Sequence, residues 1–139
     1  MVRKEMSRTI EELLNMPYWI IDILPKQVPA GGPGQYFAAE QYLRETQLSE
    51  IKKKHLNMLL KLNCYRDISL DEGGMINPPP EQIAEAVYGR YVNIMIDDAM
   101  IISEPDDTHM TLFDPDDALL ALVTELAAGE GMFVWKGKD

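Results

Sequence analysis

The longest helical pattern in the sequence spans residues 35–62, and it constrains the fold more than any other feature. In its second half, apolar positions recur at the three- and four-residue spacing of a helix buried on one side. The members of this stripe are Leu48, Ile51, His55, Met58, Leu59 and Leu62. In the first half, Tyr36, Ala39 and Leu43 lie on a rotated face. The pattern therefore predicts a helix that bends or breaks near residues 46–49.

Short strands are predicted around this helix. Two apolar runs in 91–103 are separated only by Asp97 and Asp98, and a two-residue turn there would place Ile94 opposite Ile101; a longer loop also fits. Further strands are predicted for residues 18–24, 64–70, 109–113 and 131–135, and helices for residues 7–15, 80–88 and 114–128. The hairpin is apolar on both faces, so we expect either a sheet covered on both sides or an open face that meets a second copy.

These elements give an α+β fold class, with a mostly antiparallel sheet of about five or six strands flanked by a long central helix and shorter helices. At 139 residues with 46% apolar content, the chain is predicted to form a single α+β domain over residues 1–139. We expect a cytoplasmic protein, because the first sixteen residues lack the apolar core of a signal peptide and no apolar run reaches membrane-spanning length. The one cysteine, Cys64, is predicted to be a small buried hydrophobe at the start of a strand.

Charge is divided unevenly along the chain. Residues 1–69 hold ten Lys/Arg and eight Asp/Glu, a net charge of +2, whereas residues 70–139 hold three and fifteen, a net charge of −12. An acidic surface repels phosphate backbones and anionic membranes, so we expect no nucleic-acid and no membrane partner. A basic protein partner fits better. The basic run Lys52-Lys53-Lys54 is predicted to be a solvated helix face that could meet the acidic half of a second copy.

The segment Ser103–Leu120 concentrates this acidity, with six carboxylates and one histidine. In its first part, Asp106 and Asp107 are predicted to lie in a solvated turn, because the calcium-loop pattern fails for lack of a central glycine and of alternating oxygen ligands. In its second part, Asp114 is predicted to cap the following helix, with Pro115 at the first helical position.

Motifs of catalysis and of cofactor binding are missing from the sequence. The glycine-rich stretch before the long helix lacks the Gly-Lys-Ser/Thr of a phosphate loop, and no G-x-G-x-x-G, G-x-S-x-G, H-E-x-x-H or C-x-x-C is present. We therefore assign no catalytic residue, no metal ligand and no cofactor. His109 shares a strand face with Thr111 and Phe113, and it is the residue most open to a binding role beside Asp106 and Asp107.

The segment WIIDILPKQVP, residues 19–29, followed by Gly-Gln-Tyr-Phe at 34–37, resembles the N-terminal part of a family of small bacterial proteins of about this length. That family has no assigned activity, so the resemblance implies a bacterial, cytosolic protein and transfers no functional residue. Physically, prolines and Lys26 directly after an apolar strand give a stiff loop, which loses little entropy on binding. Trp19 and Lys26 are therefore further binding candidates.

Three classes of function remain open. We favour a small acidic, non-catalytic binding protein that engages a basic protein partner or self-associates as a homodimer. The first alternative is a metal-assisted hydrolase that uses the Asp/His-rich segment 97–109, which requires its side chains to converge in a cleft. The second is a small-ligand binding domain built on Trp19 and Trp135, which requires an open apolar pocket.

Overall fold

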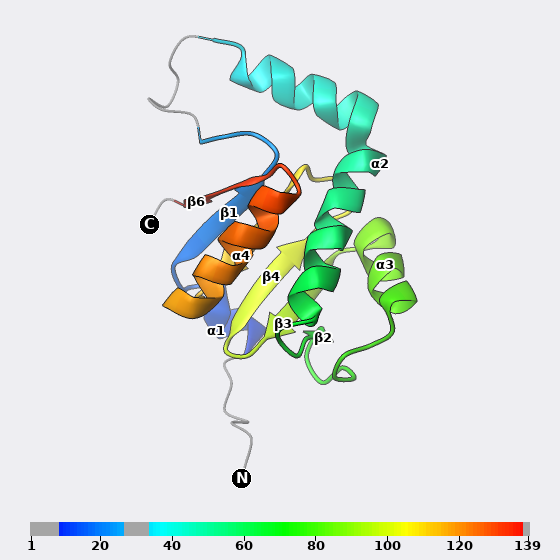
Figure 1. Ribbon diagram of the computed structural model, residues 1–139, viewed down its shortest axis with the longest axis vertical. Helices are drawn as coiled ribbons and strands as arrows, with labels where there is room; N and C mark the ends of the chain where they lie inside the picture. Colours follow the sequence, from blue (N-terminus) through cyan, green and yellow to red (C-terminus); the bar gives the residue numbers. More distant parts are fainter. Residues whose placement is uncertain (1–8, 27–33, 138–139) are drawn as a thin grey trace.

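The computed structural model describes residues 9–26 and 34–137. It is an α+β fold with one six-stranded antiparallel sheet, as the sequence predicts, in the strand order β2-β3-β4-β5-β1-β6. Figure 1 shows the helices and the sheet together. The helices are α1 (Ile10–Leu13), α2 (Tyr36–Asn63), α3 (Pro80–Gly89) and α4 (Asp117–Gly129). The strands are β1 (Tyr18–Asp22), β2 (Ser69–Leu70), β3 (Val92–Ile96), β4 (Ala99–Ser103), β5 (His109–Phe113) and β6 (Phe133–Lys136).

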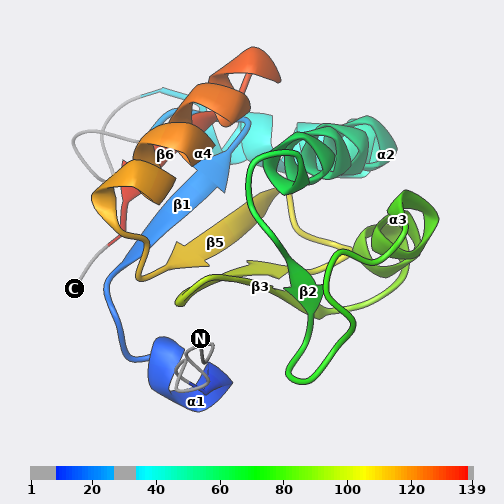
Figure 2. The same ribbon diagram turned by 60° about the horizontal axis from the view of Figure 1, so that its bottom comes forward.

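Three helices share one face of the sheet, and α1 lies alone on the other (Figure 2). The main core forms between the sheet and α2, α3 and α4, with fully buried residues such as Ile94, Ile101 and Leu112. A smaller cluster on the opposite face packs Leu13 of α1 against Met100 and Phe113. We call this second face the open face, because α1 is the only described helix on it.

Helix α2 confirms the predicted bend. Gln47 leaves helical geometry at φ −133° and ψ 22°, and the first half of the helix extends past the end of the sheet (Figure 1). Beyond the bend, the predicted stripe is largely buried, but Lys52 is buried as well, at 2% exposure. The predicted solvated face is therefore wrong for Lys52. No helix in the described part of the chain, α2 included, is long and apolar enough to cross a membrane.

The β3–β4 hairpin has the predicted register. Ile94 lies opposite Ile101 and Ile96 opposite Ala99, so Asp97 and Asp98 form a two-residue turn. Asp97 takes the left-handed conformation, φ 54°, that such a tight turn demands.

Two local predictions need correction. Cys64 is exposed at the C-terminal cap of α2, because the helix continues to Asn63 and only Ser69–Leu70 of the predicted strand is formed. The cap of α4 is Asp116, whose Oδ1 accepts the N–H of Leu119 at 2.8 Å. Asp114 instead has a positive φ of 53°, and its N–H donates to the carbonyl of Pro17, which extends the ladder between β5 and β1.

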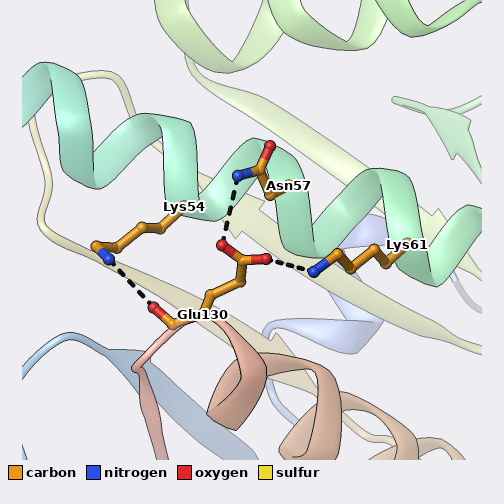
Figure 3. A network of polar contacts seen from close by, with 4 residues as sticks. All are labelled: Lys54, Asn57, Lys61 and Glu130. Carbon is orange, nitrogen blue, oxygen red and sulfur yellow. Dashed lines mark hydrogen bonds and ion pairs between the residues drawn. The ribbon is translucent and has the colours of Figure 1, made fainter.

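A polar clamp joins α2 to the end of α4 (Figure 3). The carboxylate of Glu130 accepts from Lys61 at 2.6 Å and from Asn57 at 3.4 Å, and its carbonyl accepts from Lys54 at 3.3 Å. Partial burial raises the pKa of the Glu130 carboxyl, but the hydrogen bonds from Lys61 and Asn57 and the lysine charges outweigh it, so the net pKa is lowered. The clamp is therefore held by an ionised carboxylate.

Candidate functional site

We call residues 104–108, which connect β4 to β5, the acidic turn. It lies beneath the bend of α2 (Figure 1). The N–H of Asp107 donates to the carbonyl of Glu104 at 3.2 Å, so Asp106 and Asp107 lie in a turn, as predicted, with Pro105 at its second position. Asp106 is exposed and Asp107 is half-buried. His109 begins β5 directly opposite Asp22 of β1.

Asp22 is buried at 3% exposure, beside the predicted site residue His109. Burial raises the pKa of the Asp22 carboxyl, although a hydrogen bond from the Leu24 amide and the proximity of His109 act in the opposite direction. A carboxyl and an imidazole that face each other across two strands form a polar pair at this end of the open face.

The predicted acidic residues do not converge. Asp97 and Asp98 lie at the tip of the β3–β4 hairpin, at the opposite end of β4 from Asp106 and Asp107. Among the residues that the structure describes, no group of three or more His, Cys, Asp or Glu side chains is arranged to hold a metal ion. In the described structure, Asp97 and Asp98 therefore do not come together with Asp106, Asp107 and His109.

The aromatic candidates lie apart as well. Trp19 pairs with Lys136, whose Nζ lies 5.7 Å from the Trp19 ring centroid, whereas Trp135 pairs with Ile20. Neighbouring strand residues point to opposite faces, so Trp19 and Trp135 do not line one pocket. Lys26 is exposed at the end of the described segment, and most of the stiff loop predicted after it lies outside the described residues.

Two buried bases connect α2 to the acidic turn. Lys52 Nζ donates to the carbonyl of Glu104 at 2.7 Å and to Ser103 Oγ at 3.2 Å. Burial lowers the pKa of Lys52 to about 8, although the carboxylates of Asp107, Asp106 and Glu104 pull it upward. The Lys52–Ser103 pair has the composition of a base and a nucleophile, but both residues are almost fully buried, so a substrate cannot reach them.

His55, one turn further along α2, is fully buried, and its Nε2 lies 3.2 Å from the carbonyl of Thr108. A carbonyl can only accept, so Nε2 carries the proton and Nδ1 is the basic nitrogen. Burial lowers the pKa of His55 to about 3, and the positive charge of Lys52 adds to the effect. The burial of His55 is the one expected from its place on the apolar stripe.

A pocket lies at the other end of the sheet, beside the start of α1, the β2 edge and the tip of the β3–β4 hairpin. It has a volume of about 370 Å³, in the lower part of the range of about 300–1,000 Å³ that is common for ligand sites. Its described lining combines Asp67, Asp71, Glu72 and Asp97 with Thr9, Ser69, Gly73, Ile68, Ile76 and Met95. We call it the acidic pocket.

The carboxylates of the acidic pocket come from the alternating residues around β2 and from two neighbouring loops. Ile68 and Leu70 are buried in the main core, so the alternate residues Asp67, Ser69 and Asp71 face the open side. The β2–α3 loop and the hairpin tip add the other two carboxylates.

Each carboxylate of the acidic pocket has a partner. Asp71 accepts from the amide of Asn93 and pairs with Arg90, and Asp97 pairs with Arg66. Glu72 Oε2 accepts from the amide of Ile10 at 2.9 Å, and Asp67 Oδ1 accepts from Asn77 Nδ2 at 2.9 Å. Four carboxylates against two arginines leave a local charge of about −2.

Asn93 adds an unsatisfied acceptor beside this pocket. Its backbone exchanges hydrogen bonds with Asp71, and it lies two residues from Met95 on the same side of β3. The side chain is 7% exposed, and its Oδ1 has no hydrogen-bond partner. A buried acceptor without a donor is costly, so a donor that reached it would be stabilised.

Sequence reasoning missed the acidic pocket, although one signal was present. The polar residues in RDISLD alternate with the apolar ones, which indicates a strand with an acidic outer face. The contributions of Thr9 and Asp97, by contrast, come from distant parts of the chain and cannot be placed without the fold. Comparison with protein-family models, with curated proteins and with solved structures found no match for this chain.

Proposed function

We propose that this protein is a non-catalytic binding protein that receives a basic segment of a protein partner in the acidic pocket. The observation that carries the proposal is an open pocket of about 370 Å³ whose lining combines carboxylates with apolar side chains. A lysine or arginine side chain matches such a site, because its charged head meets the carboxylates while its aliphatic stem covers the apolar residues.

Exposed apolar side chains at the rim support a protein partner over a small cation. Met75 and Ile76, at 60% and 52% exposure, lie in the loop that forms one wall of the acidic pocket. Large apolar side chains that are exposed beside a polar pocket are typical of interaction surfaces. A segment that alternates basic and apolar residues therefore suits both parts of the surface.

The chemistry of the lining favours binding over catalysis. Its described residues offer carboxylates that already accept hydrogen bonds, and the hydroxyls of Thr9 and Ser69. They include no histidine, cysteine or lysine, the side chains that most often act as general bases or activated nucleophiles.

The experiment measures fluorescence anisotropy of a labelled hexapeptide of alternating arginine and leucine, with a glutamate–leucine peptide as the negative probe. Two double variants are compared with the wild type: Asp67→Asn with Glu72→Gln at the pocket, and Asp106→Asn with Asp107→Asn at the acidic turn. Both raise the net charge by two and keep the side-chain shapes. Loss of charge-assisted contacts of about 1.5–3 kcal/mol should weaken binding about tenfold or more in the pocket variant.

The turn variant is the matched control, and its affinity should stay within about twofold of the wild type. The opposite pattern would move the docking surface to the acidic turn. Equal weakening in both variants would mean diffuse attraction to an acidic protein and would contradict a specific pocket. No binding of the basic peptide to the wild type would also contradict the proposal.

A further inference from the structure

The contact between α2 and the acidic turn depends on two bases from which water is excluded. Lys52 and His55 lie one helical turn apart on α2, and both hydrogen-bond to carbonyls of the Ser103–Thr108 segment. Both are buried to 2% exposure or less. The contact adjoins the bend at Gln47, where the first half of α2 departs from the sheet.

A second proton on His55 cannot be accommodated in this arrangement. Nδ1 is the atom that would take it, and Nδ1 has no hydrogen-bond partner in the described structure. The Oγ1 of Thr108 is likewise buried without a partner. Protonation would therefore place a second positive charge near Lys52, in a site that water does not reach, so an open contact binds the proton far better than a closed one.

Charged or titratable groups from α2, β5 and the acidic turn face the two bases. On α2 itself, His55 faces Lys52, and from β5 it faces His109, which lies opposite Asp22. Lys52 faces the carboxylates of the turn, Glu104, Asp106 and Asp107. The attraction between these carboxylates and Lys52 favours the closed contact.

We propose that the contact between α2 and the β4–β5 turn is an acid-released latch, in which protonation of His55 opens the contact and frees the acidic turn while the sheet stays folded. The latch lies at the opposite end of β4 from the acidic pocket and does not depend on the function proposed for that pocket. Its opening would expose the ammonium of Lys52, which is buried in the closed contact, beside turn carboxylates that are already wholly or partly exposed.

The size of the effect follows from linkage. The pKa of His55 is about 3 when the contact is closed and returns toward 6.5 when it is open. Between these values the open form binds a proton and the closed form does not, so the closed form loses stability as the pH falls through this window. From pH 7 to pH 5, the equilibrium constant for opening should rise about 25-fold.

Amide hydrogen exchange followed by NMR at pH 7 and pH 5, corrected for intrinsic exchange rates, measures this opening residue by residue. Amides of α2 around His55 should show the rise of about 25-fold, whereas amides of the β3–β4 hairpin should not. The chain has two histidines, which supplies a matched control. His109→Gln should keep the rise, and His55→Phe should remove it.

Several results would overturn the latch. An opening constant for the wild type that is equal at the two pH values would do so, and so would a rise that disappears in His109→Gln. The same rise in the hairpin amides would mean global unfolding in place of local release. If His55→Phe does not fold, the wild type and His109→Gln still decide between the two histidines.

Discussion

Replacement of Lys52 by methionine isolates the free-energy effect of a buried ammonium. The substitution keeps an unbranched side chain in the same space and removes the charge. In the folded protein the pKa of Lys52 is about 8, against 10.5 for an ordinary lysine. Each pKa unit corresponds to about 1.4 kcal/mol, so the charged form lowers the free energy of unfolding by at most about 3 kcal/mol, and by less where solvent screens the turn.

The sign of the pH dependence follows from proton counting. Between pH 8 and pH 10.5 the unfolded chain holds a proton on Lys52 and the folded chain does not, so this group makes the wild type more stable as the pH rises. At pH 7, Lys52→Met removes the cost of the charge, but it also removes two hydrogen bonds worth about 1 kcal/mol each. The variant should therefore be as stable as the wild type at pH 7, or up to about 1 kcal/mol more stable.

Urea unfolding at pH 7, 8, 9 and 10 gives the free energies of both proteins. The free energy of unfolding of Lys52→Met relative to the wild type should fall steadily above pH 8, by at most about 3 kcal/mol in total, so that the variant becomes the less stable protein. The exposed neighbour Lys53 provides the control, because Lys53→Met should follow the wild-type curve. A difference between Lys52→Met and the wild type that stays constant across this range would mean that folding does not lower the pKa of Lys52.

Two further substitutions test local features of α4. Asp116→Ala should cost about 1 kcal/mol through loss of the cap on the Leu119 amide, whereas Asp116→Asn should cost little; equal stability of the two variants by thermal unfolding would contradict the cap. Glu130→Gln should lower stability by up to about 1 kcal/mol at pH 7, and the loss should fade as the pH falls and the wild-type carboxylate is protonated. A loss that is the same at pH 7 and pH 3 would argue against an ionised clamp.

Periodicity predicted those parts of the fold that are set by neighbouring residues. The change of apolar face along residues 35–62 predicted the bend that the structure has at Gln47. The two Asp residues between apolar runs predicted the hairpin register, because the pleat leaves few ways to pair Ile94 and Ile101. In both cases, local pattern and tertiary packing favour the same arrangement.

The prediction failed for the N-terminal cap of α4, because two nearby residues could each take that role. Asp114 and Asp116 both precede α4, and both are good capping residues. The structure uses Asp116, because the amide of Asp114 is needed by the carbonyl of Pro17 in the sheet. That competing partner lies almost a hundred residues away, so the sequence around α4 cannot reveal it.

The predicted solvent exposure of Lys52 was wrong for a related reason. A lysine beside an apolar stripe is normally solvated, and its burial here depends on acceptors from the β4–β5 turn, fifty residues further along the chain. The acidic pocket therefore replaces the acidic turn as the proposed binding site. Its carboxylates already act on an internal ammonium, while the acidic pocket at the other end of the sheet is open to solvent.

The proposed function requires that a basic segment binds in the acidic pocket and not at the acidic turn. The most direct test is a two-dimensional NMR titration of the isotope-labelled protein with the arginine–leucine hexapeptide. We expect saturable shifts of the amides of Ser69, Asp71, Gly73 and Met95, with little change in the Glu104–His109 segment. Shifts confined to Glu104–His109, or shifts that spread weakly over the surface without saturation, would contradict the proposed function.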